Sequence, residues 1–427
     1  MSVNNINLDK YPHIVIVGGG FAGLTLAKRL RKKRFRVTLI DKNNYHQFAP
    51  LFYQVAAAQL EPSAILFPLR KEIRPYPRNK FLMADVLDVD PENKTLKTSV
   101  GDISYDYLVL SAGTDSNFFG MEGVRQNAFG LKSVSEALAL RNHLLQLLEQ
   151  ASCCKNTEEY RTTLNIAVVG GGPTGVEIAG AIGEMKRYIL KRDYPAIKSE
   201  DLRIILVEGQ PRLLAAMSEK SGKRAQRYLT QLGVELMLGK SVSDYDGKTL
   251  KLADGQTIDT YTVIWGSGVT GGRVQGLDES LYQKGNRLKV DEHNRLEGNS
   301  SIFILGDIAL QTEAKYPKGH PQVAPVAVQQ AKLLSKNLVR MQKEKPLKPF
   351  RYRNKGAMAI VGRNRAVADI GKMHFGGFIA WLMWLFIHLL SIIGFKNKLF
   401  VVIDWAFSYF SHDASLRLII RPKNKNK

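Results

Sequence analysis

Two glycine-rich stretches of the chain have the spacing of nucleotide-binding turns. HIVIVGGGFAGLTLA at residues 13–27 and IAVVGGGPTGVEIAG at residues 166–180 both contain the pattern GxGxxG. Glycines at these positions let the backbone approach a pyrophosphate closely, and the N–H groups at a helix start favour its negative charge. Each stretch therefore predicts a cradle for a dinucleotide. The alternative is a turn that only lets a helix and a strand pack closely.

Each turn belongs to a strand–turn–helix–strand unit that ends on an acidic residue, Asp41 in the first and Glu208 in the second. An acid about 20 residues after the glycines is placed to accept hydrogen bonds from ribose hydroxyls. The predicted elements are strands at 13–17, 36–40, 165–169 and 202–207 and a helix from 176 to about 189. The turn glycines are Gly18, Gly20 and Gly23 in the first unit and Gly170, Gly172 and Gly175 in the second.

The acid of the second unit also bears on the choice of nicotinamide cofactor. A carboxylate repels a 2′-phosphate, whereas NADP sites present an arginine at this place. Arg212 lies nearby in the sequence, but Glu208 comes directly after the strand. NADH is therefore favoured over NADPH.

The 427 residues suit two or three domains, and their charge is strongly basic. A total of 61 Lys and Arg against 39 Asp and Glu gives a formal net charge of +22. Such an excess favours anionic partners. No zinc-finger spacing or aromatic RNA-binding run is present, so an acidic membrane surface is a better candidate than nucleic acid. A soluble basic protein is the alternative.

Cysteine chemistry is nearly excluded. The chain has two cysteines, Cys153 and Cys154, and adjacent cysteines rarely bridge each other. A disulfide framework, a CxxC redox pair and a cysteine metal site are therefore not expected, and no His, Asp or Glu cluster has metal-site spacing. The start, MSVNNINLDKYP, lacks the apolar run of a secretory signal, which predicts residence in the cytosol.

The C-terminal region contains a long apolar run from Gly376 to Phe395, interrupted by His388 and Ser391. Its length would allow a transmembrane helix. However, Trp381 and Trp384 lie inside the run, and a second amphipathic stretch follows at 398–410. A helical hairpin in one leaflet, with basic residues at anionic headgroups, is the favoured interpretation. A buried core helix or a dimer interface would also produce such a run.

The order of these segments resembles the two-dinucleotide-binding-domain flavoproteins, in which a nicotinamide unit is inserted into a flavin domain. LVLSAGT (108–114) and TVIWGSGVTG (262–271) are similar to strands that cross beneath a nucleotide in that superfamily. FILGDIA (303–309) is similar to the segment whose Asp, here Asp307, binds the ribityl hydroxyls of FAD. The resemblance implies FAD in the first unit and NADH in the second.

Three stretches narrow the resemblance to type II NADH dehydrogenases. NYHQFAPLFYQVA (44–56) resembles the segment that these enzymes lay along the flavin, and VAPVAVQQAK (323–332) resembles their helix start below the isoalloxazine ring. Residues 375–410 resemble their membrane-attaching C-terminus. The resemblance extends from His13 to about Arg421.

This resemblance implies an α/β fold class with two Rossmann-like dinucleotide-binding domains and a C-terminal membrane-attaching helical region. We expect an FAD-binding domain at 10–125 and 290–345, an inserted NADH-binding domain at 126–289, and a membrane-associating region at 346–427. The expected activity is that of a single-subunit NADH:quinone oxidoreductase of a respiratory chain. It would pass a hydride from NADH to FAD and then two electrons to menaquinone or ubiquinone, without pumping protons.

The resemblance also implies peripheral, monotopic attachment to the cytoplasmic face of the inner membrane and a homodimer. The expected FAD-binding residues are Gly18, Gly20, Phe21, Ala22, Gly23, Asp41, Lys42, Pro50, Tyr53, Gln54, Val86, Ala112, Gly113, Gly306, Asp307, Ala327 and Val328. The expected NADH-binding residues are Gly170, Gly172, Pro173, Thr174, Gly175, Glu177, Glu208 and Gly268. The expected catalytic residues are Glu177 and Gln329, the quinone-site candidates are Gln329 and Gln330, and no metal ligands are expected.

Glu177 stands in the first turn of its helix, where the helix dipole alone favours a carboxylate. The resemblance suggests in addition that it faces the contact zone of nicotinamide and flavin, where it would order the carboxamide or relay a proton. Many relatives have Ala-Gln where this chain has Ala324-Pro325, and Pro is comfortable at a helix start. This departure leaves Gln329 as the candidate quinone ligand.

Other functions remain open at this point. A disulfide reductase needs a redox cysteine pair, and a sulfide:quinone oxidoreductase needs cysteines near the flavin. A reductase of a soluble ferredoxin would suit the basic charge but would leave the apolar C-terminus unexplained. A membrane-bound redox sensor that binds NADH without turnover is the non-enzymatic alternative.

Overall fold

The computed structural model describes residues 10–73, 78–153, 158–411 and 416–419. The chain forms two compact units, and each is assembled from separate stretches of sequence. The stretches of the first unit are Met1–Gln47, Leu66–Asp115 and Val269–Asn354, and those of the second are Phe48–Ile65, Ser116–Gly268 and Lys355–Lys427. The expected division into FAD, NADH and C-terminal domains stays a prediction.

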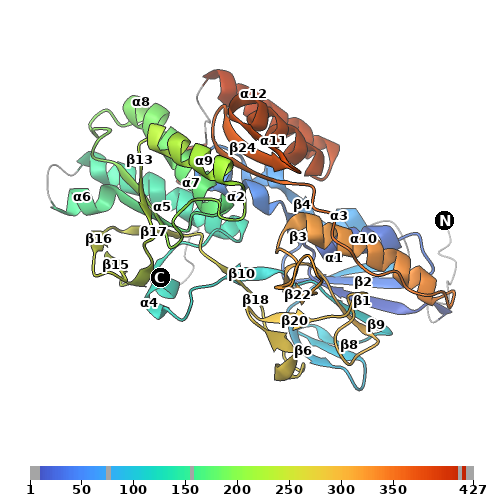
Figure 1. The fold of residues 1–427 in the computed structure, drawn as a ribbon. Coiled ribbons are helices and arrows are strands. Elements are labelled where there is room, and N and C mark those ends of the chain that lie inside the picture. Colours follow the sequence, from blue (N-terminus) through green and yellow to red (C-terminus); the bar gives the residue numbers. More distant parts are fainter. Residues whose placement is uncertain (1–9, 74–77, 154–157, 412–415, 420–427) are drawn as a thin grey trace. The chain divides into compact units, whose positions relative to one another are not determined.

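A five-stranded parallel sheet with the strand order β21-β9-β1-β2-β5 forms the centre of the first unit (Figure 1). Strand β1 is buried along its whole length, as its Ile- and Val-rich sequence predicts for a strand covered on both faces. The strands are β1 (His13–Val17), β2 (Arg36–Asp41), β5 (Asn79–Met83), β9 (Tyr107–Leu110) and β21 (Ile302–Ile304).

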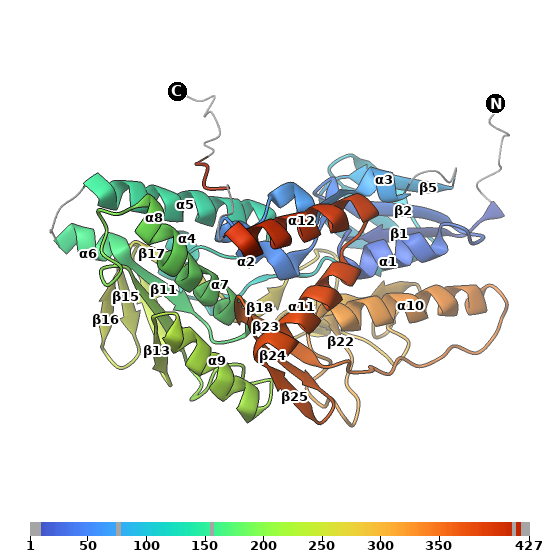
Figure 2. The ribbon, with the colours of Figure 1, turned by 90° about the horizontal axis from the view of Figure 1, so that it is seen from above.

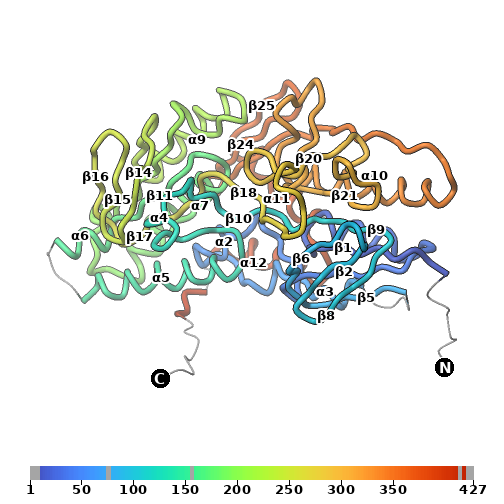
Figure 3. The backbone as a smooth tube through the Cα atoms, turned by 90° about the horizontal axis from the view of Figure 1, so that it is seen from below, coloured from blue at the N-terminus to red at the C-terminus, as the bar shows by residue number. Residues whose placement is uncertain are grey.

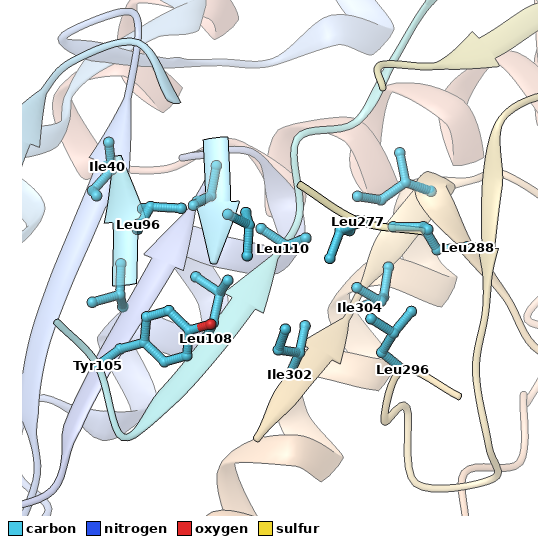
Figure 4. Close-up of a cluster of buried hydrophobic side chains, with 14 of the residues drawn as sticks. Ile40, Leu96, Tyr105, Leu108, Leu110, Leu277, Leu288, Leu296, Ile302 and Ile304 are labelled. Carbon is cyan, nitrogen blue, oxygen red and sulfur yellow. The ribbon is translucent and has the colours of Figure 1, made fainter. Parts of the chain in front are cut away.

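Helices α1 (Phe21–Leu30) and α10 (Ala324–Met341) lie side by side in the first unit (Figure 2). Apolar side chains of β9 and β21 contribute to its core, where Leu108 and Leu110 lie near Ile302 and Ile304 (Figure 4). The smaller elements are β3 (Tyr45–Gln47), β4 (Leu66–Pro68), α3 (Leu69–Ile73), β6 (Val86–Asp90), β7 (Thr95–Thr98), β8 (Gly101–Ser104), β19 (Tyr282–Gln283), β20 (Arg287–Lys289) and β22 (Ala309–Leu310). The linking strands β10 (Thr114–Ser116) and β18 (Val269–Gly271) pair with each other.

The second unit repeats the parallel arrangement with the strand order β13-β12-β11-β17. An antiparallel sheet of β14, β15 and β16 lies at one end of the unit (Figure 3). The strands are β11 (Asn165–Val169), β12 (Arg203–Glu208), β13 (Val234–Leu238), β14 (Val242–Tyr245), β15 (Thr249–Leu252), β16 (Thr257–Asp259) and β17 (Thr262–Trp265). The helices are α2 (Phe52–Ala56), α4 (Glu122–Asn127), α5 (Val134–Cys153), α6 (Glu158–Leu164), α7 (Pro173–Glu184), α8 (Lys191–Asp193) and α9 (Glu219–Gln231).

The C-terminal part of the second unit is an antiparallel sheet followed by two helices. Its strands are β23 (Ala357–Gly362), β24 (Arg365–Ile370) and β25 (Met373–Gly376), and its helices are α11 (Gly377–Ser391) and α12 (Phe395–Ser411). Strand β23 packs on α7, and α11 packs on β24. Helices α11 and α12 are therefore held on the unit that carries the second glycine turn.

The apolar run does not form one continuous helix, because α11 ends at Ser391 and a new helix begins at Phe395. The 15 residues of α11 would extend about 22 Å, which is less than the roughly 30 Å of a bilayer core. Among the helices of the described residues, none has both the length and the hydropathy that a membrane crossing requires. The interpretation as a transmembrane helix is therefore not supported, and a pair of helices is present where a hairpin was expected.

The structure confirms the predicted strands at 13–17 and 165–169 to the residue. The helix predicted from 176 to about 189 begins at Pro173, earlier than expected, because proline is tolerated in a first turn, where a missing N–H costs nothing. This helix ends at Glu184 and continues as a π-helical turn over Met185–Leu190.

Candidate functional site

In the first glycine turn, the backbone of Gly23 packs directly against the backbone of Gly18. A Cβ atom on Gly23 would lie 1.9 Å from the carbonyl oxygen of Gly18, which no side chain tolerates. Gly18 has a φ of 96° and donates its N–H to the carbonyl of Ile40 at 2.8 Å. Nothing lies within 4 Å of the Cβ position of Gly20, and α1 has no side-chain cap. The start of α1 is thus open to an anionic ligand.

Asp41 borders this turn and is fixed by it. Its Oδ2 accepts the N–H of Gly19 at 2.6 Å, and its Oδ1 accepts the N–H of Asn43 at 2.7 Å. Burial raises the pKa of Asp41, and these two N–H groups oppose the shift. The carboxylate stands beside the glycine turn, where the sequence placed a ribose ligand.

The predicted Gly306-Asp307 segment lies close to the start of α1, near the first glycine turn. Gly306 has a φ of 73°, and its Cβ position would lie 3.4 Å from Cβ of Ala327 and 3.7 Å from Cβ of Ala22. Thr114 donates its hydroxyl to Oδ2 of Asp307 at 3.4 Å. Residues from the two ends of the first unit therefore meet at one place, and they form a site that fits the diphosphate and ribityl chain of FAD.

The predicted quinone ligands Gln329 and Gln330 already have partners within the first unit. Gln329 donates its amide to the carbonyl of Arg353 at 3.0 Å and accepts the Arg353 N–H at 3.1 Å. Gln330 is buried, and its Oε1 accepts the N–H of Gly306 at 2.7 Å. The two side chains hold backbone segments in place, and a role in binding quinone stays a prediction.

The second glycine turn repeats the geometry of the first. A Cβ atom on Gly175 would lie 1.8 Å from the carbonyl oxygen of Gly170, and the Cβ position of Gly172 is open. Glu208 accepts the N–H of Gly171 at 2.5 Å and that of Gln210 at 2.6 Å. Pro173 and Thr174, also predicted as ligands, are exposed at the start of α7. The arrangement fits a second dinucleotide with an acid at the ribose position.

Gly268, the last predicted NADH ligand, follows strand β17 and has a φ of 75°. Its Cβ position would lie 2.5 Å from Cζ of Phe119, whose side chain is largely exposed. The chain at Gly266 borders Gly170, since a Cβ on Gly170 would meet the Gly266 carbonyl carbon at 2.8 Å. Gly268 therefore follows the segment that borders the glycine turn, and its positive φ favours glycine at this position.

Helix α7 begins at this turn and packs directly on the backbone of strand β23. A Cβ atom on Gly180 would lie 1.9 Å from the carbonyl oxygen of Val361. On one side of this contact Glu177 accepts the N–H of Ile360 at 3.4 Å. On the other side Glu184 accepts the N–H of Arg363. The helix thus presents two carboxylates to one strand.

Glu177 titrates far from its usual range. Burial raises its pKa from 4.5 to about 8, and the N–H groups of Ile360 and Trp384 oppose the shift only in part. The indole nitrogen of Trp384 is buried, and among the described residues no partner meets the full distance and angle requirements of a hydrogen bond to it. At neutral pH Glu177 is mainly protonated and can donate a proton.

A cavity of about 590 Å³ lies beside this contact between α7 and β23, and all its lining residues belong to the second unit. Its polar lining includes Tyr53, Gln54, Gln59, Glu177, Glu184 and Arg363. Its apolar lining comes mainly from the C-terminal helices, with Phe378, Leu382, Leu385, Phe386, Leu389 and Val402. An apolar molecule with a small polar head would match these surfaces.

The predicted flavin-segment residues Tyr53 and Gln54 form part of this cavity. Gln54 donates to the hydroxyl of Tyr53 at 2.9 Å and accepts the indole N–H of Trp405 at 3.0 Å. The sequence did not identify Glu184, Arg363 or Trp405 as members of the site. For Glu184 a signal existed, because it follows Glu177 by seven residues and so lies on the same helix face.

Comparison with known proteins places these features in a family. Residues 12–331 match the model of the family described as pyridine nucleotide-disulphide oxidoreductase, and residues 354–412 match the model described as NDH2 C-terminal domain. The chain belongs to the pyridine nucleotide-disulphide oxidoreductase family.

Within that family, the chain is similar to type II NADH:quinone oxidoreductases. It is 35% identical to the type II NADH:quinone oxidoreductase Ndh of Mycobacterium tuberculosis, over 93% of this chain and 88% of the relative. It is 30% identical to that of Haemophilus influenzae, over 84% and 87%. NDH2 of Plasmodium falciparum in complex with NADH shares the fold with a TM-score of 0.87 at 21% identity, over 96% of this chain and 100% of the neighbour. The chain is thus a member of the type II NADH dehydrogenase family, which confirms the resemblance inferred from its motifs.

The two glycines of the second turn allow a matched test of the cradle. Gly175→Ala should lower the stability of the second unit by about 1–3 kcal/mol or more and abolish NADH binding, because its Cβ would overlap the Gly170 carbonyl. Gly172→Ala should leave the melting temperature unchanged, because its Cβ position is open. Thermal unfolding with and without NADH measures both. Equal melting temperatures for the two variants would contradict the geometry.

Glu177 should make the protein less stable at high pH. A carboxyl with a pKa of 4.5 when unfolded and about 8 when folded binds more protons in the folded state, so stability falls as the pH rises from about 4.5 to 8. Glu177→Gln removes this dependence, and its advantage over the natural protein should grow from pH 5 to pH 9. Melting temperatures at pH 5, 7 and 9 measure the difference, and parallel curves for the two proteins would argue against a Glu177 that is protonated at neutral pH.

Proposed function

We propose that this chain is an NADH:quinone oxidoreductase that passes a hydride from NADH to bound FAD and then two electrons to a membrane quinone, without pumping protons. The observation that carries the proposal is helix α7. It starts at a dinucleotide cradle and presents Glu177, about one turn later, and Glu184, about three turns later, to an apolar cavity. Membership of the type II NADH dehydrogenase family supports the same activity.

Each of the two glycine turns would bind a different cofactor. In the first unit Gly18, Gly20, Gly23, Asp41 and Asp307 would hold FAD. In the second unit Gly170, Gly172, Gly175 and Glu208 would hold NADH, and the Glu208 carboxylate disfavours a 2′-phosphate. Bound FAD supplies a ring that accepts a hydride and returns two electrons, so the protein itself has to bind, orient and supply protons.

The cavity of the second unit is the proposed quinone site. The side chains of α11 and α12 would accommodate an isoprenoid chain, and the polar groups of Tyr53, Gln54 and Glu177 would meet a quinone headgroup. Glu177 would donate a proton to a quinone oxygen, since it is protonated at neutral pH. Both menaquinone and ubiquinone have the chemistry that this cavity fits.

The rival chemistries lack their essential groups. The chain has two cysteines, at adjacent positions 153 and 154, and neither is part of a CxxC pair. Sulfide:quinone oxidoreductase of Aquifex aeolicus has the same fold with a TM-score of 0.72, at 18% identity, but this likeness concerns the fold alone. Quinone reduction driven by NADH requires no cysteine and remains the best-supported activity.

We propose that α11 and α12 attach the protein to the cytoplasmic face of the inner membrane without crossing it. Large apolar side chains are exposed along both helices, among them Ile379, Phe386 and Leu390 on α11 and Ile403 and Phe407 on α12. Such a surface is unusual for a soluble monomer and suits a lipid interface. The net charge of +22 would favour anionic headgroups, and a twin subunit in a homodimer would cover part of the apolar surface.

The activity can be tested by following the flavin itself. The purified protein should be yellow, NADH should bleach the flavin absorbance without oxygen, and a quinone should restore it. NADPH should bleach it far more slowly. A protein that cannot be reconstituted with FAD, or one whose reduced flavin is not reoxidised by any quinone, would disprove the proposed function.

Membrane attachment can be tested with two matched double variants. Ile379→Glu/Phe407→Glu should weaken binding to anionic liposomes at least ~100-fold, because each side chain contributes roughly 1.5–3 kcal/mol when buried in lipid. Neither residue lines the cavity, so flavin bleaching by NADH should be unchanged. Leu87→Glu/Val100→Glu, which alters similarly exposed side chains of the first unit, is the control for liposome sedimentation. Equal binding of the two variants would exclude α11 and α12 as the attachment surface.

A further inference from the structure

We propose that Glu184 is a second proton-transfer residue, which delivers a proton from water to the cavity wall that Glu177 shares. The inference rests on the proposed quinone reductase activity and assigns a role to a residue that the sequence analysis did not identify. It follows from the position of Glu184 on α7, its contacts and the proton balance of the reaction.

The reaction requires a proton from outside the cofactors. The overall conversion is NADH + H⁺ + quinone → NAD⁺ + quinol. The hydride carries two electrons and one proton out of nicotinamide, whereas the two quinone oxygens receive two protons. One proton per turnover therefore comes from water and has to reach an apolar cavity. A single acid such as Glu177 can donate this proton once and must then be reprotonated.

Glu184 stands where a reprotonating group is needed. It lies seven residues after Glu177 on α7, which is two helical turns or roughly 10 Å along the same helix face. Both side chains line the same cavity, and both are half-buried. Gly180, between them, holds β23 against the helix, so the two carboxylates stay on one seam.

The surroundings of Glu184 suit a carboxyl that changes its protonation state. Burial raises its pKa, while the N–H of Arg363, the charges of Arg365 and Arg363 and the side chain of Gln59 oppose the shift. The other titratable groups that line the cavity are Glu177, Tyr53, Tyr188, Arg363 and Tyr409. Burial raises the pKa of Tyr53 well above its usual value. Glu184 therefore differs from Glu177, because nearby arginine charges oppose the effect of burial on its pKa.

A purely structural role makes a different prediction. Glu184 accepts the backbone N–H of Arg363 and thereby fixes the turn that follows β23. A glutamine at this position retains an oxygen that accepts the same N–H but cannot carry a proton. Glu184→Gln therefore removes the ability to carry a proton but keeps the hydrogen bond to the Arg363 N–H. Glu184→Asp keeps a carboxyl that can carry a proton, on a shorter side chain.

The test separates the two half-reactions by stopped-flow spectroscopy on the full-length, FAD-containing protein in liposomes. In Glu184→Gln, flavin bleaching by NADH should stay within about twofold of the natural protein. Reoxidation by a quinone at pH 7 should slow by roughly 10²-fold, which is the lower range for loss of a general acid or base. The solvent deuterium isotope effect on reoxidation should increase. Glu184→Asp should recover much of the rate, and formate should accelerate Glu184→Ala.

A control variant and two distinct outcomes complete the test. Glu219→Gln, an exposed glutamate paired with Lys223 on α9, should leave both half-reactions unchanged. Unaltered reoxidation in Glu184→Gln, with loss only in Glu184→Ala and no rescue by formate, would assign Glu184 a structural role and overturn the proposal. A natural protein that no quinone reoxidises would instead disprove the underlying activity, so the two failures are distinguishable.

Discussion

Helix α7 and strand β23 touch at Gly180, where a Cβ atom would lie 1.9 Å from the carbonyl oxygen of Val361. The second unit depends on this contact. The helix begins at the dinucleotide turn of Gly170–Gly175, and the strand leads through β24 and β25 into α11 and α12. Because no side chain separates them, the nucleotide cradle and the apolar helices are parts of one packed body. Glu177 and Glu184 use the N–H groups of this strand region as hydrogen-bond partners and border a cavity in the same place.

The two glycine turns also depend on close backbone contacts that only glycine allows. In both units the third glycine lies against the carbonyl of the first, and the second glycine leaves the helix start open. An acid at the end of the next strand then hydrogen-bonds back to the turn, Asp41 in one unit and Glu208 in the other. Two copies of one local arrangement thus fit two dinucleotides, while α11 and α12 contribute part of the cavity lining and an exposed apolar surface. Electron transfer from NADH to quinone by this route needs no cysteine, and the chain has only two.

Local sequence patterns predicted the parts of the structure that local physics determines. The strands, the glycine turns and the acids could be predicted because buried parallel strands are continuous apolar runs and close backbone contacts require glycine. The cavity could not be predicted, since Gln54, Glu177 and Trp405 come together only through tertiary packing. The same limit applies to residues 48–65, which pack with the second unit although they lie within the first part of the sequence. The motif that suggested Gln329 as a quinone ligand gave no sign of its hydrogen bonds. Its side-chain amide donates to the carbonyl of Arg353 and accepts the Arg353 N–H.

The central claim is that quinone is reduced in the cavity between α7, β23 and the C-terminal helices. Photoaffinity labelling tests it most directly. An azido-quinone in liposomes would be irradiated with the FAD- and NADH-loaded protein, and the modified peptides identified by mass spectrometry. The account predicts labels on residues 177–190, 358–363 and 378–410, with competition by excess natural quinone. Labels confined to α10 around Gln329 and Gln330, with none on these three segments, would contradict it.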